Sequence, residues 1–425
     1  MIRFTVCILM AVAGLGFASL GRFDHSDGGI LLDKIKQARH ELRDERVQLI
    51  KGQVGTRQVR VGRRRYITVP VIGIVAREMA IAVMDPQGAI KVARAVKRTE
   101  GFEVQTPGLT LSMRRENGIN SDISCIQPAG GVVLAVKYPV SNEGGRFGPG
   151  SETLEVVYTP YSGEIATQAV VARGIELQHH LIDKAYSRLK DRQVFSRAFP
   201  GKLVAKVIPE DIVTVLLMNE HIDPSQFTSA GLAEPLVKQV LTIIATNDDH
   251  AYAYSVSPAG ARGLVQMIPS TYSLIRGRYP EARLDPDFAS GMGDPLNAVM
   301  AQVLLCDSDW QSIRSRVELP AEKAGPYLAA AYNGGVGRVL SILANDETQW
   351  MEAPESNNRP TMTVSRRVPV RVRSRGRTRT TYVIRSYSQP IFRAETNKYV
   401  RQYHWINDFF VKQGVKGFTA FPKQE

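Results

Sequence analysis

Apolar and polar positions follow two different patterns along the chain, and the change falls near residue 200. Residues 57–160 consist of short runs rich in Val, Ile, Thr and Tyr, broken by Gly and Pro, which is typical of strands. After residue 205, apolar residues recur at three- and four-residue steps, as they do in helices. We therefore expect an α+β protein, with a smaller mixed α/β domain over residues 21–200 and a mainly α-helical domain over residues 205–425.

Individual elements can be placed within this division. Strands are expected over residues 132–136 and 154–158, and Pro200–Gly201 marks a plausible domain boundary. Helices are expected over residues 26–52, 165–193, 211–218, 232–246, 297–306 and 324–332, and after Gly337. A length of 425 residues exceeds one core of ordinary size, which agrees with two domains.

The first residues have the charge pattern of an export signal. Arg3 is followed by a run from Phe4 to Leu20 that contains no charged side chain. This run is short for a membrane-spanning helix and suits the apolar core of a signal peptide. Residues 1–20 are therefore expected to be a signal peptide, with an uncleaved inner-membrane anchor over residues 4–20 as the alternative. Both alternatives place the remaining chain in the periplasm or cell envelope.

Net charge is +13, and much of the excess is local. Between Val364 and Arg393 there are nine arginines and no Asp or Glu; they are residues 366, 367, 371, 373, 375, 377, 379, 385 and 393. Alternating valines and arginines around Gly376 predict a two-stranded arm within an insertion at 355–390, with a solvated loop as the alternative. Because the arginines share a parity through Arg379, we expect one charged face. An exported basic arm, Arg366–Arg385, is expected to meet anionic wall polymer or membrane surface rather than nucleic acid.

Cysteines and histidines give little sign of covalent or metal chemistry. Cys7 lies in the leader, and Cys125 and Cys306 fall in different predicted domains, so two separate thiols are expected, with a single disulfide as the alternative. The neighbours His179 and His180 would point about 100° apart on a helix and could not hold one metal ion together. No metal or other cofactor is expected.

Three short blocks carry the candidate chemistry. The first, Ser257–Thr271, combines small residues that permit close backbone approach with the amide of Gln266. The second is Ala331–Gly335 (Ala-Tyr-Asn-Gly-Gly), and the third is Glu395–Val400 (Glu-Thr-Asn-Lys-Tyr-Val). In this order they resemble the catalytic domain shared by soluble lytic transglycosylases and goose-type lysozymes, over roughly residues 205–405.

The resemblance implies a lysozyme-like fold and a peptidoglycan substrate. The enzyme would cut the β-1,4 bond between N-acetylmuramic acid and N-acetylglucosamine and form a 1,6-anhydro ring, with one carboxyl acting first as acid and then as base. Gln266 would line the sugar groove and Ser257 would face the acid. Tyr332 and Asn333 would hydrogen-bond the sugar, and Glu395 would support the site from the far wall.

The acid itself can be placed in two ways. In the family it ends a helix and precedes the Ser of the glycine block by nine residues, which in this chain is Asp248. Glu220 instead closes the apolar stretch Ile212–Met218, but an insertion of roughly 28 residues would then separate it from the block. We favour Glu220, because burial at the end of an apolar helix raises a carboxyl pKa, whereas Asp248 lies in a polar turn. His221 stands where the family usually has Ser.

Three rival functions remain open at this point. A hydrolytic lysozyme-like muramidase would use Glu220 together with Asp248 or Asp249 as a second carboxylate. A catalytically inactive peptidoglycan-binding protein would fit the displaced acid and the basic arm. A specialised wall opener would use residues 21–200 to dock onto an envelope machine.

Overall fold

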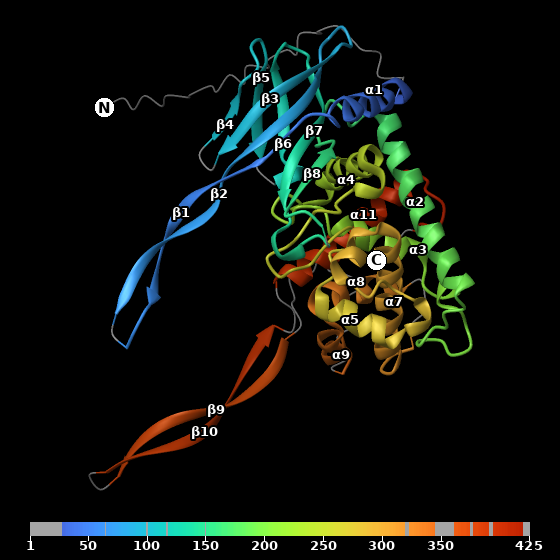
Figure 1. Ribbon diagram of the computed structural model, residues 1–425. Helices are drawn as coiled ribbons and strands as arrows, with labels where there is room; N and C mark the ends of the chain where they lie inside the picture. Colours follow the sequence, from blue (N-terminus) through green and yellow to red (C-terminus); the bar gives the residue numbers. More distant parts are fainter. Residues whose placement is uncertain are drawn as a thin grey trace, which may run out of the picture.

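The computed structural model describes residues 28–63, 65–98, 101–115, 118–148, 150–318, 323–344, 361–374, 377–390 and 394–419. The protein is a mixed α+β molecule, with a sheet in its N-terminal part and helices in its C-terminal part (Figure 1). The predicted leader lies outside the described residues. Within the described ranges, no helix has both the length and the apolar composition required to span a bilayer.

The N-terminal part is built from antiparallel strands. They are β1 (Leu49–Arg60), β2 (Tyr66–Met84), β3 (Ile90–Arg98), β4 (Gly101–Val104), β5 (Thr110–Arg115), β6 (Asp122–Gln127), β7 (Val132–Ser141) and β8 (Thr153–Tyr158). One sheet has the order β4-β3-β2-β7-β8, with β1 paired to β2, while β5 and β6 form a hairpin of their own. Strands β7 and β8 confirm the two predicted strands.

Both faces of this sheet are covered. Alternate residues of β2 point to opposite sides of the sheet and so pack in two different clusters. Met79 and Ile81 pack with side chains of the β5–β6 hairpin. Ala80 and Ala82 pack instead with the helix α1 (Gly28–Glu41). The sheet is therefore a middle layer between a hairpin and a helix.

The prediction of one helix over residues 26–52 is wrong in its second half. Helix α1 ends at Glu41, and the strand β1 begins at Leu49. The apolar steps continue past the helix end, but residues from Leu49 onward pair with β2. Pairing with β2, which lies further along the chain, decides the conformation here, and the local apolar periodicity cannot reveal such a partner.

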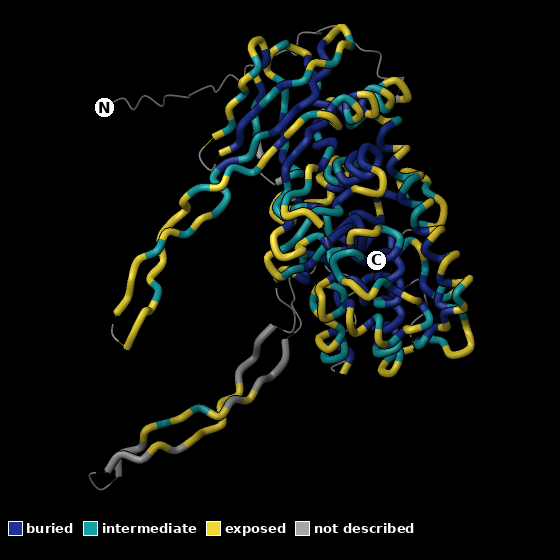
Figure 2. The backbone as a smooth tube through the Cα atoms, in the orientation of Figure 1, coloured by how far each residue is buried: buried dark blue, intermediate teal, exposed yellow. Residues whose placement is uncertain are grey.

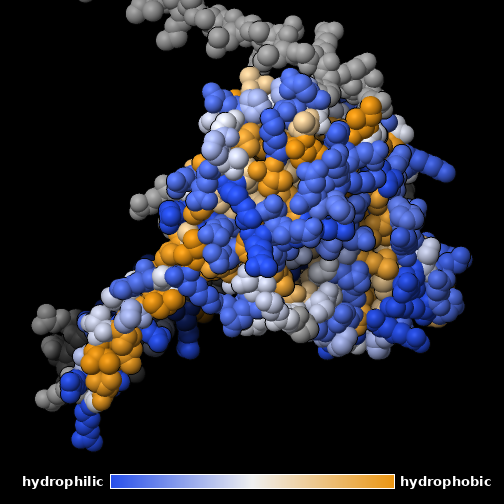
Figure 3. All heavy atoms as spheres, turned by 45° about the horizontal axis from the view of Figure 1, so that its top comes forward, coloured by the Kyte–Doolittle hydropathy of each residue, from blue (hydrophilic) through white to orange (hydrophobic). Residues whose placement is uncertain are grey.

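The far half of β2 leaves the sheet and forms an arm. Strand β3 pairs with β2 only from Ala76 to Met84, whereas β1 pairs with it from Tyr66 to Arg77. The ribbon of β1 and β2 therefore projects from the body, and most of its residues are exposed (Figures 1 and 2). Figure 3 shows apolar side chains gathered along this first arm, residues 49–77.

The C-terminal part is helical and confirms the remaining helix predictions. Its helices are α2 (Gln168–Asp191), α3 (Glu210–Asn219), α4 (Ala233–Asn247), α5 (Pro269–Arg278), α6 (Phe288–Gly293), α7 (Pro295–Arg314), α8 (Ala324–Gly334), α9 (Val336–Leu343) and α11 (Ala394–Lys412). Helix α2 packs on α3, α4 and α7.

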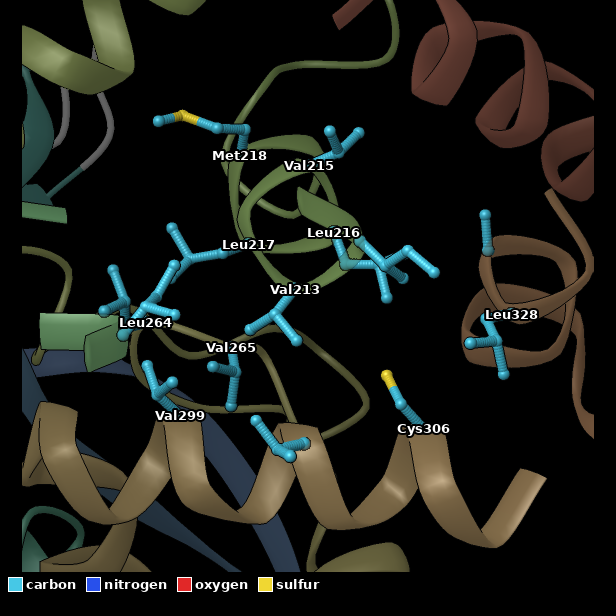
Figure 4. Close-up of a cluster of buried hydrophobic side chains, with 14 of the residues drawn as sticks. Val213, Val215, Leu216, Leu217, Met218, Leu264, Val265, Val299, Cys306 and Leu328 are labelled. Carbon is cyan, nitrogen blue, oxygen red and sulfur yellow. The ribbon is translucent and has the colours of Figure 1, made fainter. Parts of the chain in front are cut away.

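Helix α3 lies at the centre of this helical part. Every residue from Ile212 to Met218 is at most 2% exposed. In Figure 4 the side chains of α3 pack among Leu264 and Val265 of the glycine block, Val299 and Cys306 of α7, and Leu328 of α8. Such complete burial fixes the position of whatever residue follows the helix.

A second arm is formed by β9 (Thr361–Ser374) and β10 (Arg377–Pro390), which confirms the predicted two-stranded form. The prediction of a single charged face is wrong. Each β9 residue pairs with a β10 residue of opposite parity, as Arg371 does with Thr380 and Val372 with Arg379. Odd-numbered positions on the two strands therefore belong to opposite faces of the ribbon.

The two described cysteines are separate thiols, as predicted. Cys125 lies half-buried in β6, and Cys306 is buried in α7. Burial raises the pKa of both thiols above the ordinary value.

Candidate active site

Glu220 is the first residue after α3 and closes the helix with an αR backbone. Its backbone N–H donates to the carbonyl of Leu216 at 3.2 Å, so its position follows from the buried helix. The sequence prediction of a carboxyl at the end of an apolar helix is thereby confirmed. The side chain is half-buried rather than exposed.

The surroundings of the Glu220 carboxyl favour its protonated form. Burial is the main cause that raises its pKa from 4.5 to about 7. The hydroxyl of Tyr399 donates to Oε1 at 2.6 Å and acts in the opposite direction, whereas the charge of Glu395 adds to the increase. At neutral pH a substantial fraction of Glu220 is therefore protonated and able to donate a proton.

His221 connects the end of α3 to the glycine block. Its Nε2 lies 2.6 Å from the carbonyl oxygen of Leu264, and its ring stacks on Tyr252 with 3.6 Å between ring centroids. Burial lowers the pKa of His221 to about 4, so the ring is neutral at pH 7. Since a carbonyl only accepts, Nε2 carries the proton and donates it. His221 thus positions the block without adding charge beside Glu220.

The glycine block owes its shape to backbone contacts that other residues would break. Gly263 has φ +66°, and a Cβ there would lie 2.1 Å from the carbonyl oxygen of Met292. The hydroxyl oxygen of Ser257 accepts the N–H of Ala261 at 3.0 Å and closes the preceding turn. The amide of Gln266 donates to the carbonyl of Gly263 at 2.8 Å, from a left-handed backbone with φ 45°.

A cavity of about 600 Å³ joins these residues. Glu220, Ser257 and Gln266 line it from the helical part, together with Tyr252 and Tyr254. The structure therefore brings three of the predicted site residues to one hollow. Strands of the N-terminal sheet also contribute to its wall.

Tyr332 lies outside the lining of this cavity but near its acid. Its hydroxyl donates to the carbonyl of Val265 at 2.5 Å, which ties α8 to the glycine block. Burial raises the Tyr332 pKa well above its usual range, and the charge of Glu220 contributes. The Tyr332 phenol is thus a neutral hydrogen-bond donor that holds the glycine block in place without lining the cavity.

Asn333 and Glu395 are both exposed and also lie outside the described lining of the cavity. The Asn333 side-chain oxygen accepts the hydroxyl of Thr396 at 2.7 Å and fastens α8 to α11. Glu395 acts on the site through its charge, which raises the pKa of Glu220.

Asp248, the alternative acid, is placed elsewhere. It is exposed and has a left-handed backbone angle, φ 48°, at the end of α4. Asp248 and Asp249 line a separate hollow of about 70 Å³ beside α2. Neither lines the cavity that holds Glu220.

Two groups of residues at the site escaped the sequence prediction. Tyr399 belongs to the third block, four positions after Glu395, and that helical spacing was a usable signal. Arg77, Tyr138, Arg146 and Phe147 line the cavity from the N-terminal part. No motif marks these four residues, because only the packing of the two parts brings them to the site.

Among the described residues, no group of three or more His, Cys, Asp and Glu side chains is arranged to hold a metal ion. Comparison of the chain with known protein families found no matching family model. Searches of curated proteins and of solved structures also returned no match.

Proposed function

We propose that this protein is a peptidoglycan lytic transglycosylase with a lysozyme-like helical domain. The observation that supports it most is Glu220, a carboxyl with a pKa of about 7 at the end of a buried helix, facing a cavity of about 600 Å³. Ser257 and Gln266 line the same cavity, in agreement with the roles implied by the family resemblance. The proposal requires an exported enzyme, because its substrate lies outside the cytoplasm.

One carboxyl suffices for the reaction. Protonated Glu220 gives its proton to the glycosidic oxygen as the bond from that oxygen to C1 of the muramoyl residue breaks. The muramoyl 6-hydroxyl then attacks C1 and passes its proton to the Glu220 carboxylate. The acid is restored, and the products are a free N-acetylglucosamine 4-hydroxyl and a 1,6-anhydromuramoyl end. No water is consumed and no cofactor takes part.

Hydrolysis by a muramidase is the second candidate, because the carboxylates of Asp122 and Asp223 also line the cavity. One of them would have to activate a water molecule in that mechanism. Oδ1 of Asp223 already accepts the N–H and the hydroxyl of Ser225, each at 2.8 Å. Those bonds engage the Asp223 carboxylate within the loop and favour a structural role for it.

The arms are proposed to attach the enzyme to an anionic surface, either wall polymer or membrane headgroups. The second arm contains the acid-free run of arginines, and Arg367, Arg371 and Arg385 are exposed there. The first arm is also basic: residues 49–77 hold seven Lys and Arg and no Asp or Glu. Exposed Ile72 and Ile384 add apolar contact area to the two arms.

Product analysis tests the function directly. Purified protein without the expected leader, residues 21–425, is incubated with sacculi, and the released muropeptides are identified by mass spectrometry. The proposal predicts 1,6-anhydro ends. Reducing ends would establish the muramidase instead, and sedimentation with sacculi without any release would establish an inactive wall-binding protein.

A further inference from the structure

The sheet forms one wall of the cavity and is held firmly against the helical part. The side-chain amide of Asn120 donates to the Ser255 hydroxyl at 3.2 Å. The buried amide of Asn247 exchanges two hydrogen bonds with the backbone of Thr159, of 2.8 and 2.9 Å. Because these contacts join the sheet to α4 and to the loop that carries Ser257, its wall is a fixed part of the site.

Arg77 of β2 is the distinctive group on this wall. Its guanidinium lies over the ring of Tyr138, 5.7 Å from the centroid. Its Nε is buried without a hydrogen-bond partner, and no carboxylate of the described residues forms an ion pair with it. Arg77 is half-buried and lines the cavity, so a cation without a carboxylate partner among the described residues lies where an anionic ligand could reach it.

The neighbouring charges limit the kind of ligand. Arg146, exposed at the rim over Phe147, is a second cation of the same wall. Asp122 and Asp223 also line the cavity, and Oδ1 of Asp223 accepts two hydrogen bonds from Ser225. Arginine presents its donors as a planar fork that matches a carboxylate.

We propose that Arg77, assisted by Arg146, binds a carboxylate of the peptide stems that a peptidoglycan strand carries. This inference rests on the proposed function, since it names which part of that substrate the sheet wall recognises. The N-terminal part then selects peptide-bearing strands over bare glycan, in the same cavity that Glu220 lines. A docking module remote from the chemistry would not line the cavity in this way.

The test compares Arg77→Gln with Arg98→Gln on two substrates. Arg98 is exposed on β3 and is paired with Ala76, so its register position belongs to the sheet face opposite to that of Arg77. With peptide-bearing strands, Arg77→Gln should raise KM by about tenfold, the effect of losing one charge-assisted contact. With strands freed of peptides by an amidase, KM should not change. Arg98→Gln should behave like the wild type on both substrates.

An equal loss on both substrates, or no loss on either, would overturn the inference while leaving the proposed function intact. Binding supplies a readout that needs no turnover. A soluble peptide-bearing disaccharide titrated into the Glu220→Gln variant should bind about tenfold more weakly when Arg77→Gln is added. If the wild type cleaves neither substrate, the proposed function fails, and this titration alone decides whether Arg77 recognises the peptide.

Discussion

The hydroxyl of Tyr399 donates a 2.6 Å hydrogen bond to Oε1 of Glu220, and so connects α11 to the end of α3 across 179 positions of sequence. Burial and the charge of Glu395 favour the protonated carboxyl, whereas this bond favours the ionised form. A pKa of about 7 is the balance of these effects. A group that first gives and then takes a proton works best with a pKa near the working pH.

Replacing Tyr399 by Phe should raise the pKa of Glu220 further, because the contact that stabilises the carboxylate is removed. The alkaline limb of the pH–rate profile should then move to higher pH. Turnover should fall by about tenfold, since the carboxyl loses one orienting hydrogen bond. The profile of anhydromuropeptide release measures both effects. Tyr186→Phe is the matched control: it removes a buried 2.9 Å bond to the carbonyl of Ile208 and should leave the limb in place.

Glu220 and His221 should oppose each other in the pH dependence of stability. The Glu220 pKa is raised from 4.5 to about 7, so its contribution is lost as pH rises through that interval. The His221 pKa is lowered from 6.5 to about 4, so its contribution is lost as pH falls through that interval. Between pH 4.5 and 6.5 the two slopes nearly cancel.

Substitution should separate the two slopes. The free energy of unfolding of Glu220→Gln should rise with pH between 4 and 6.5, by at most about 3 kcal/mol. That of His221→Gln should fall between pH 4.5 and 7 by a similar amount. Denaturant titrations at several pH values measure both. A Glu220→Gln profile parallel to that of the wild type would contradict the burial of this carboxyl.

Two glycines of the glycine block form a second matched pair. Gly263→Ala should destabilise the protein by about 3 kcal/mol or more, because the new Cβ meets the Met292 carbonyl and φ is positive. Gly260→Ala has a similar φ of +81° but open space around it, so only about 1 kcal/mol of backbone strain is expected. Thermal unfolding of the two variants checks the order, and equal losses would contradict the close contact at Gly263.

The sequence predicted what local chemistry decides. The helices of the C-terminal part follow from apolar periodicity, and Glu220 from its place after the apolar stretch Ile212–Met218. Residues 49–52 have a helical apolar pattern but form a strand, because β1 pairs with β2, which lies further along the chain. The faces of the second arm differ from the prediction for a related reason: the register across the turn, rather than parity along the sequence, assigns each position to a face.

The sheet wall of the cavity could not be predicted. Arg77 lies 143 positions before Glu220 along the chain and is one of many arginines in a basic sequence. Its relation to the acid depends on how the two parts pack, through contacts such as that between Asn120 and Ser255. Pairwise packing of this kind leaves no periodic signal in either segment.

Neutralising the second arm should weaken attachment without affecting the chemistry. The triple variant of Arg367, Arg371 and Arg385 to Gln should bind sacculi or anionic vesicles less tightly at low salt, where exposed charges attract most strongly. The difference from the wild type should shrink as salt is added, because screening limits such charges to about 8–10 Å at physiological ionic strength. Cleavage of soluble glycan fragments should be unchanged. The corresponding triple Lys variant keeps the charge and should bind normally. Cosedimentation with sacculi and with vesicles, assayed separately across a salt series, identifies which surface the arm binds. If the Gln variant bound like the wild type at every salt concentration, electrostatic attachment through this arm would be refuted.

Exchange of the carboxyl at position 220 is the decisive test of the acid. Glu220→Gln keeps the size of the side chain and a hydrogen-bond donor but cannot transfer a proton, so release of 1,6-anhydromuropeptides should fall to background while glycan binding persists. Asp248→Asn should keep near-native turnover, because Asp248 is exposed and lines a hollow separate from the cavity of Glu220. Circular dichroism and binding to sacculi show that both variants remain folded. If Glu220→Gln kept its turnover and Asp248→Asn lost it, the acid would be Asp248, and the nine-residue spacing to Ser257 would outweigh the position of Glu220 at the helix end.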